Sequence, residues 1–324
     1  MPCAMAAEHV PEPDDWLRRH RLPDGAEQSH VLMPDGWPVR VVHLPQRDKG
    51  HILILTGRAD FAEKYAEVLH DLADAGWGAT IFDWRGQGLS RRVGKTPQHG
   101  ASPGFPVWLR DLASMIEWAS ARSDGPLVAM AHSMGGHLLL RHLAAGGGGV
   151  ARAVLLAPMI GLNVQPVGPG IGRWLAGVQV VRGKGDDYVW GGGPWQPGRP
   201  GEQRQRWLTS DIERFRDESW WIGTYPALAL GSVTWGWLDD AFASIDALTA
   251  PGAAEGIATP VQFQIPARDG LVDCAATRRL AARIPGAQLI EYADGAHELL
   301  READPLRQQV LADALAFLDM ISLP

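Results

Sequence analysis

The sequence predicts an α/β protein whose mostly parallel sheet is covered by helices on both faces. Two observations support this fold class. Short apolar segments alternate along the chain with longer segments of helical period, and one long stretch interrupts this alternation. Alternation indicates a parallel sheet, because a helix usually makes the crossover between two parallel strands. Right-handed crossovers place the carboxyl ends of such strands at one edge of the sheet, where ligands bind.

The expected strands are short and rich in Val, Ile, Leu and Ala. They cover Val39–Leu44, His51–Leu55, Ala79–Asp83, Leu127–Ala131, Ala153–Ala157, Val261–Ile265 and Ala287–Tyr292. The expected helices have apolar residues every three or four positions. They cover Phe61–Ala75, Phe105–Ser123, Ser133–Ala145, Val272–Ile284 and Pro305–Met320.

Residues 159–259 break this alternation, although a short crossover helix would be enough to join the flanking strands. Eight of the 14 tryptophans lie in this stretch, which is also rich in glycine. We interpret it as a Trp-rich helical lid inserted into an α/β core of residues 29–158 and 260–324. The alternative is a variable surface excursion whose tryptophans pack only a small core of their own. Residues 1–28 are expected to form a flexible N-terminal tail.

The composition is that of an ordinary globular protein, with 46% hydrophobic and 21% charged residues. A net charge of −7 argues against nucleic acid as a partner, because nucleic-acid-binding proteins present a concentrated basic face. Of the two cysteines, Cys3 lies in the polar, Pro-rich tail, so we expect no structural disulfide with Cys274.

The N-terminus is interrupted by acidic residues before an apolar core could form, which argues against a signal peptide. No stretch approaches the roughly 20 apolar residues of a membrane span. We therefore expect a cytoplasmic protein, with attachment to the inner face of the membrane left open.

Ser133 stands between an expected strand and an expected helix, in the sequence AHSMGG over residues 131–136. In a nucleophile elbow, a serine on a sharp strand-to-helix turn projects its Oγ above the sheet. The residues two positions away must be small because the helix crosses close to the strand, and Ala131 and Gly135 meet this need. The helix N-terminus also favours the negative charge of an oxyanion. The alternative is a serine that only caps a helix.

A general base for Ser133 is expected late in the chain, because histidine is the last triad member in this architecture. His137 and His142 lie on the helix that the serine opens, so they point away from the edge where ligands bind. His297 instead lies in a loop directly after the strand 287–292. It is the candidate base, and the alternative is an ordinary surface-loop histidine.

The acid of the triad should follow a strand between Ser133 and His297 in the sequence. Asp269 comes directly after the strand 261–265 and precedes the histidine by 28 residues. It would accept the Nδ1–H of His297 and fix its tautomer. Asp273 is the rival acid, although it is also placed to cap the next helix.

The oxyanion hole is expected to use two backbone N–H groups, that of Met134 and one from the loop after the strand 51–55. Gly57 allows a tight turn in this loop, so the second donor is expected to be the N–H of Arg58. The Arg58 side chain would then be free to meet a charged head group, unless it pairs with Asp60 or Glu63.

Other chemistries fit the sequence less well. An aspartate nucleophile would need a carboxylate at position 133. His132, His137 and His142 recur every five residues, so they do not share the helix face that a metal site needs. The glycines at 86 and 88 are typical of a turn rather than of a phosphate-binding loop. We expect no metal and no cofactor.

The motifs resemble those of the bacterial lysophospholipases and monoacylglycerol lipases. That family carries H-G, E-x-Y, D-x-R-G-x-G-x-S, G-H-S-M-G-G, D-x-x-V and H-E in this order. The corresponding segments here are residues 56–58, 63–65, 83–90, 131–136, 269–272 and 297–298. The resemblance covers most of residues 30–320 and includes Trp235 and Trp237. This chain departs from the pattern at Thr56, where the family has histidine, and at Ala131, where it has glycine.

The resemblance implies an α/β-hydrolase fold with an eight-stranded sheet and the triad Ser133, Asp269 and His297. It also implies a small-molecule substrate, a lysophospholipid or a monoacylglycerol, with Trp235 and Trp237 at the substrate. A general carboxylesterase or an acyltransferase with the same triad is the alternative enzyme. A binding protein without turnover is the alternative outside enzymes.

Overall fold

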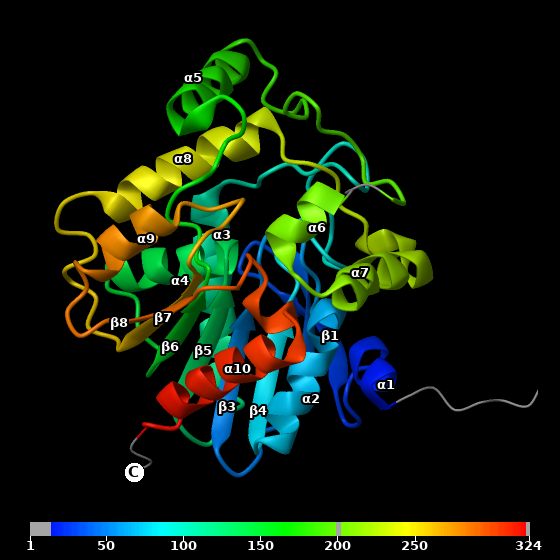
Figure 1. The fold of residues 1–324 in the computed structure, drawn as a ribbon, viewed down its shortest axis with the longest axis vertical. Helices are drawn as coiled ribbons and strands as arrows, with labels where there is room; N and C mark the ends of the chain where they lie inside the picture. The colour runs from blue at the N-terminus through cyan, green and yellow to red at the C-terminus, as the bar shows by residue number, and fades with distance from the viewer. Residues whose placement is uncertain (1–13, 199–201, 322–324) are drawn as a thin grey trace, which may run out of the picture.

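A computed structural model describes residues 14–198 and 202–321, which are built around one eight-stranded sheet (Figure 1). The strand order is β1-β2-β4-β3-β5-β6-β7-β8. The strands are β1 (Glu27–Leu32), β2 (Pro38–Leu44), β3 (Gly50–Leu55), β4 (Trp77–Phe82), β5 (Leu127–His132), β6 (Ala153–Leu156), β7 (Val261–Pro266) and β8 (Gln288–Tyr292). Strand β2 is antiparallel to both of its neighbours, and all other neighbouring strands are parallel. The predicted mostly parallel sheet is confirmed.

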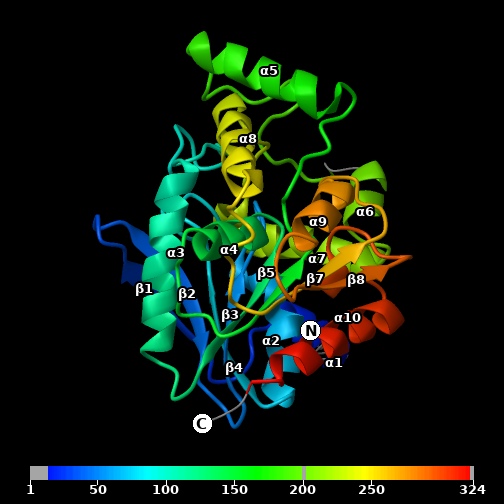
Figure 2. The same cartoon turned by 90° about the vertical axis from the view of Figure 1, so that its left-hand side faces the viewer.

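Helices cover both faces of the sheet (Figure 2). They are α1 (Asp14–His20), α2 (Ala66–Asp74), α3 (Phe105–Ser120), α4 (Met134–Ala144), α5 (Gly168–Val181), α6 (Glu202–Leu208), α7 (Ile212–Thr224), α8 (Trp235–Thr249), α9 (Cys274–Ala281) and α10 (Asp304–Leu318). Helices α3, α4 and α9 pack on one face, and α2 and α10 pack on the other. Every residue of β3, β4 and β5 is buried, as expected for strands covered on both sides.

The first 28 residues do not all form the predicted flexible tail. Residues 1–13 lie outside the described residues, but residues 14–28 contain helix α1 and the start of the edge strand β1. Helix α1 is held from two sides: Arg18 donates to Asp71 of α2 at 2.8 Å, and Arg19 donates to Asp217 of α7 at 2.9 Å. These partners are distant in the sequence, so local composition could not predict the helix.

The insertion, residues 159–259, connects β6 to β7 and contains helices α5 to α8. Because β6 and β7 are parallel, this connection must also bring the chain back from the carboxyl end of β6 to the amino end of β7. Helix α8 makes this return. Its residues Phe242 and Leu248 are buried in the same core as α3 and α4, and Ser244 Oγ lies 2.7 Å from His137 Nε2. The predicted lid, residues 159–259, therefore includes a helix, α8, that packs on the core.

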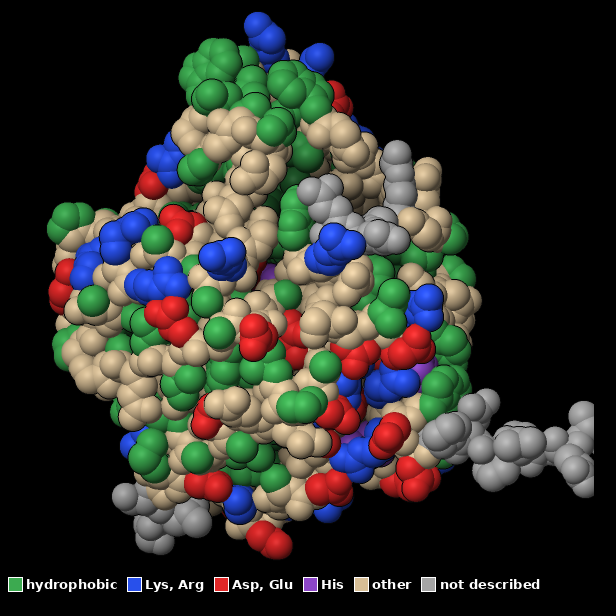
Figure 3. Space-filling model, in the orientation of Figure 1, with side chains coloured by type: hydrophobic (Ala, Val, Ile, Leu, Met, Phe, Trp, Pro, Cys, Tyr) green, Lys and Arg blue, Asp and Glu red, His purple; other side chains and the backbone are tan. Residues whose placement is uncertain are grey.

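Helix α5 packs along α8 at the end of the molecule farthest from α2 (Figures 1 and 2). Its outer side exposes large apolar side chains, including Ile171, Trp174 and Val181, of which Trp174 is 65% and Val181 89% exposed. Arg182 and Lys184 are exposed directly after it. We call these five residues the insertion tip. Figure 3 shows hydrophobic side chains gathered there, with basic side chains at the margin.

Cys274 is a free, buried thiol at the start of α9, whereas Cys3 lies outside the described residues. Burial and the nearby Asp269 carboxylate raise the pKa of this thiol to about 11. No helix within residues 14–198 and 202–321 has the length and apolar character that a membrane span requires.

Candidate active site

Ser133 occupies a sharp turn between β5 and α4. Its backbone has φ 49° and ψ −113°, a conformation that residues with a side chain rarely adopt. The turn brings α4 against the end of β3: a Cβ on Gly135 would lie 2.4 Å from the Leu55 carbonyl oxygen and 2.6 Å from that of Thr56. Only glycine fits there. At the second small position, the methyl group of Ala131 is fully buried within β5.

The structure brings Ser133, His297 and Asp269 together at the carboxyl edge of the sheet. His297 Nε2 lies 3.0 Å from Ser133 Oγ, and His297 Nδ1 lies 2.6 Å from Asp269 Oδ2. These side chains come from the turn after β5 and the loops after β8 and β7. A serine hydroxyl, an imidazole and a carboxylate in this order form the arrangement used for nucleophilic acyl transfer.

Asp269 is held in place by two backbone amides. The N–H groups of Leu271 and Val272 donate to its Oδ1 at 2.7 and 3.0 Å, which leaves Oδ2 for the histidine. Burial opposes its ionisation, but the His297 charge and these hydrogen bonds outweigh burial and lower the pKa of Asp269. The rival, Asp273, is instead the N-cap of α9, where it accepts from the amides of residues 275 and 276.

His297 is supported by the insertion as well as by the core. Its backbone N–H donates to the Trp207 carbonyl in α6 at 3.1 Å, and the N–H of Glu298 donates to the Leu208 carbonyl at 2.7 Å. Burial disfavours the imidazolium, but the carboxylates of Asp269, Glu298 and Asp60 outweigh burial and raise the pKa of His297 above its ordinary value. The environment therefore favours the charged form that appears when histidine accepts a proton.

The two predicted oxyanion donors line the same cavity as Ser133. Met134 is the first residue of α4, so its N–H has no acceptor within the helix. The amides on either side of Arg58 are engaged by side chains: that of Gly57 donates to Asp60 Oδ2 at 3.0 Å, and that of Ala59 donates to Gln87 Oε1 at 2.5 Å. Within the described residues, no acceptor meets the N–H of Arg58.

The Arg58 side chain pairs with neither of the two carboxylates that the sequence offered. Asp60 contacts Lys64 and His132, and Glu63 pairs with Arg40 at 2.5 Å. The Arg58 guanidinium instead donates to the Gly231 carbonyl at 2.8 Å. The sequence-based alternative of an ion pair with Asp60 or Glu63 is therefore wrong.

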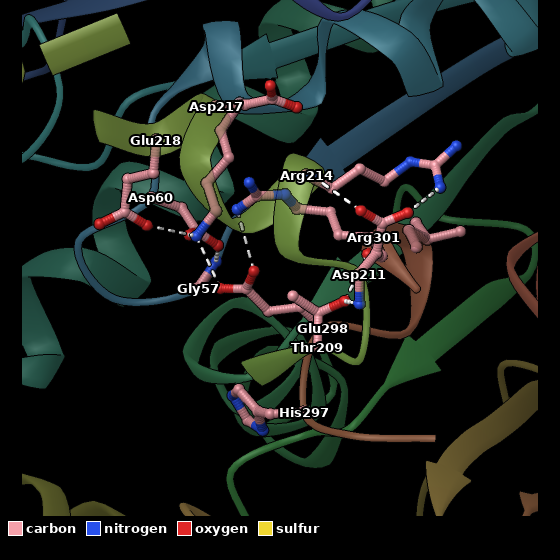
Figure 4. Close-up of polar contacts among 12 residues, drawn as sticks. Gly57, Asp60, Thr209, Asp211, Arg214, Asp217, Glu218, His297, Glu298 and Arg301 are labelled. Atoms are coloured by element: carbon pink, nitrogen blue, oxygen red, sulfur yellow. Dashed lines mark hydrogen bonds and ion pairs between the residues drawn. The ribbon is translucent and has the colours of Figure 1, made fainter. Parts of the chain in front are cut away.

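A charged cluster that sequence reasoning missed lies beneath the candidate triad. Lys64 Nζ contacts Asp60 at 2.7 Å, Glu298 at 2.6 Å and Glu218 of α7 at 3.1 Å. Figure 4 shows these three carboxylates, from three separate segments, turned toward a common point. Burial disfavours the Lys64 charge, but the three carboxylates outweigh it and raise the pKa of Lys64.

His132 links this cluster to the candidate base. Its Nδ1 lies 3.2 Å from Asp60 Oδ2, and its Nε2 lies 3.2 Å from the carbonyl oxygen of His297. The sequence did carry a signal, because Lys64 stands within the family motif at 63–65 and Glu298 follows the histidine. Glu218 lies in no motif.

The cavity beside Ser133 has a volume of about 460 Å³, which is typical of small-molecule sites. Its walls come from the core and from the insertion. Trp235 and Trp237 both line it, and each is 5% exposed. The apolar part of the lining includes Met159, Leu162, Val164, Leu175, Val233 and Leu238. The site thus combines an apolar chamber with a few polar groups at one end.

The sheet, its strand order and its solved relatives define the class of this protein, an α/β-hydrolase. The monoglyceride lipase of Saccharomyces cerevisiae superposes with a TM-score of 0.74 at 17% identity, covering 92% of this chain and 96% of that one. A carboxyl esterase of Bacillus coagulans superposes with a TM-score of 0.69 at 14% identity, covering 91% of this chain and 100% of that one.

Within this class, the chain belongs to the family described as serine aminopeptidase, S33, whose model matches residues 46–304. It is 28% identical over 279 residues to the probable lysophospholipase L2 of Haemophilus influenzae, covering 84% of each chain. It is 27% identical over 328 residues to lysophospholipase L2 of Escherichia coli, covering 97% of this chain and 92% of the relative. The protein is a carboxylic ester hydrolase that resembles lysophospholipases and monoacylglycerol lipases.

Proposed function

We propose that the protein hydrolyses carboxylic esters of a single fatty-acyl chain, either lysophospholipids or monoacylglycerols, through an acyl-enzyme on Ser133. The observation that carries this proposal is the hydrogen-bonded series Ser133–His297–Asp269 at one end of an apolar cavity. The names of the two lysophospholipase relatives support the same substrate class.

In the proposed mechanism, Ser133 Oγ attacks the ester carbonyl carbon while His297 Nε2 accepts the hydroxyl proton. The N–H groups of Met134 and Arg58 donate to the oxyanion of the tetrahedral intermediate. Asp269 holds the imidazole in the productive tautomer and stabilises its positive charge. His297 then gives the proton to the leaving alcohol. A water molecule, activated by the same histidine, hydrolyses the acyl-enzyme.

The insertion is proposed to act as a lid that covers the acyl chain, with Trp235 and Trp237 in contact with the substrate. Each methylene buried in an apolar chamber contributes about 0.8 kcal/mol. Activity on p-nitrophenyl esters should therefore rise with chain length. If the acetate ester is preferred and activity does not rise up to the octanoate ester, the lipid substrate is contradicted, although the protein could still be an esterase.

A fluorophosphonate probe tests whether Ser133 is the nucleophile. It should label the wild type but not the Ser133→Ala variant, and absence of labelling in both proteins would favour a binding protein without turnover. Adding an alcohol to the acyl-enzyme distinguishes hydrolysis from transfer. Release of free acid as the main product supports the hydrolase, whereas release of a new ester supports an acyltransferase.

We also propose that the insertion tip contacts a lipid surface from the cytoplasmic side of a membrane. Exposed Ile171, Trp174 and Val181 can enter the boundary region of a bilayer, while Arg182 and Lys184 suit anionic head groups. The protein should co-sediment with anionic phospholipid vesicles, and the Trp174→Ser/Val181→Ser variant should not. Equal sedimentation of both proteins would contradict this role of the tip.

A further inference from the structure

Arg58 is a cation in the cavity that has no carboxylate partner. No ion pair to its guanidinium is found in residues 14–198 and 202–321, although Arg58 is one of the residues that line the chamber beside Ser133. Among the described residues, three other buried cations do have carboxylate partners, whereas Arg92, like Arg58, donates only to carbonyl oxygens. Arg40 pairs with two carboxylates, Lys64 with three and Arg301 with one. An unpaired charge in a partly desolvated position lowers the stability of the fold unless an anionic ligand neutralises it.

The position of the Arg58 side chain is fixed by its surroundings. Its Nη2 donates to the Gly231 carbonyl at 2.8 Å, and its Cζ lies 5.5 Å from the ring centre of Trp237. Gly100 makes room for it, because a Cβ at that position would lie 2.3 Å from Arg58 Nη2. A carbonyl and an aromatic ring orient the guanidinium but leave its charge uncompensated.

The electrostatics of the cavity favour an anionic ligand near Arg58. Burial, together with repulsion from Arg204, lowers the pKa of Arg58 to about 9. Arg204 lines the same cavity from α6. The carboxylates in the lining, Asp60, Glu218 and Glu298, are all engaged by Lys64. The positive charges of Arg58 and Arg204 are therefore available to attract an anionic group of a ligand in the chamber.

We propose that Arg58 is the specificity-determining residue that binds the phosphate of a monoacyl glycerophospholipid whose ester lies at Ser133. The proposal rests on the proposed function and narrows its substrate from two classes to the anionic one. Arginine binds phosphate through parallel N–H···O bonds, which a neutral glycerol head group cannot accept in the same way.

The length of the arginine side chain matches the length of the substrate between its ester and its phosphate. The backbone N–H of Arg58 is the proposed oxyanion donor, so its side chain begins beside the ester carbonyl. The number of covalent bonds from the ester carbonyl carbon to the phosphorus of a 1-acyl lysophospholipid equals the number from the Cα of arginine to its terminal nitrogen. The guanidinium and the phosphate of the same substrate molecule are therefore the same number of bonds away from the oxyanion hole, which allows them to meet if the head group extends toward Gly231 and Trp237.

The first test measures binding without turnover. In the Ser133→Ala background, calorimetry would compare dodecyl phosphate with dodecanol, each with Arg58 intact or replaced by methionine. A charge-assisted hydrogen bond is worth about 10–100-fold in affinity, so Arg58→Met should weaken dodecyl phosphate binding by that factor and leave dodecanol unchanged. Arg58→Lys should recover only part of the loss. Equal affinity for dodecyl phosphate with and without Arg58 would overturn the proposal.

The second test measures selectivity. The ratio of kcat/KM for a 1-acyl lysophospholipid to that for the monoacylglycerol with the same acyl chain should fall at least 10-fold in Arg58→Met. The exposed Arg47→Met variant serves as the control and should keep the wild-type ratio. An equal loss on both substrates would mean that Arg58 only supports the oxyanion loop, which overturns its role in specificity. Failure of the wild type on every acyl ester would instead refute the proposed function.

Discussion

Replacing Gly135 with alanine should disable the enzyme by pushing apart the two halves of the proposed oxyanion hole. The added Cβ would lie 2.4 Å from the Leu55 carbonyl oxygen, whereas ordinary contacts begin at 3.4 Å. The neighbours are backbone atoms of β3 and its loop, so helix α4 must move by about 1 Å to relieve the clash. This motion separates the Met134 N–H from the Arg58 N–H. A misplacement of about 1 Å costs about 10²-fold in rate, and overpacking costs about 1–3 kcal/mol in stability.

The assay is kcat/KM on p-nitrophenyl octanoate together with the midpoint of thermal unfolding. Gly148→Ala is the matched control, because a Cβ there meets no atom within 4 Å. It should keep full activity and equal or greater stability. If Gly135→Ala keeps kcat/KM within threefold of the wild type and unfolds at the same temperature, the close approach of α4 to β3 does not constrain the site.

Three further predictions concern the triad, its electrostatics and the anchoring of the insertion. Asp269→Asn should lower kcat/KM by about 10⁴-fold, because the amide favours the wrong histidine tautomer; a loss below tenfold would contradict the assigned acid. His297 must be neutral to accept the Ser133 proton and its pKa is raised, so kcat/KM should fall on the acid side with an apparent pKa above the usual value of about 6.5. Glu298→Gln removes a nearby negative charge and should shift that limb to lower pH; an unchanged limb would argue against the charge effect. Arg214 joins α7 to Glu67 and Asp304, and replacing it with methionine should lower the free energy of unfolding by about 3 kcal/mol, because Glu67 loses its partner. Urea unfolding measures this loss, and an unchanged midpoint would show that the ion pairs do not stabilise the fold.

The sheet and the positions of the three triad candidates could be predicted because both follow from local patterns and topology. Apolar segments of β3, β5 and β7 are recognisable without tertiary information. Parallel strands then bring the loops after β5, β7 and β8 to one edge, whatever the intervening sequence. Ser133, Asp269 and His297 lie in the turn or loops that follow these strands, so topology alone brings them near one another.

The charged cluster and the anchoring of the insertion could not be predicted, because they depend on contacts between distant segments. Lys64 meets Glu218 across 154 positions and Glu298 across 234 positions. No periodicity links such residues. Likewise, nothing near Arg58 in the sequence indicates that its guanidinium reaches Gly231, or that Gly100 makes room for it.

The dual position of α8 has a practical consequence for engineering. Its first turn carries two tryptophans into the cavity, while the rest of the helix fills the space beside α3 and α4. Chimeras that exchange insertions between relatives should therefore be spliced just before Thr234, so that the recipient keeps its own α8. A splice at residue 259 would replace this part of the recipient's hydrophobic core with the donor's α8, and the residues that pack against it would have to be redesigned.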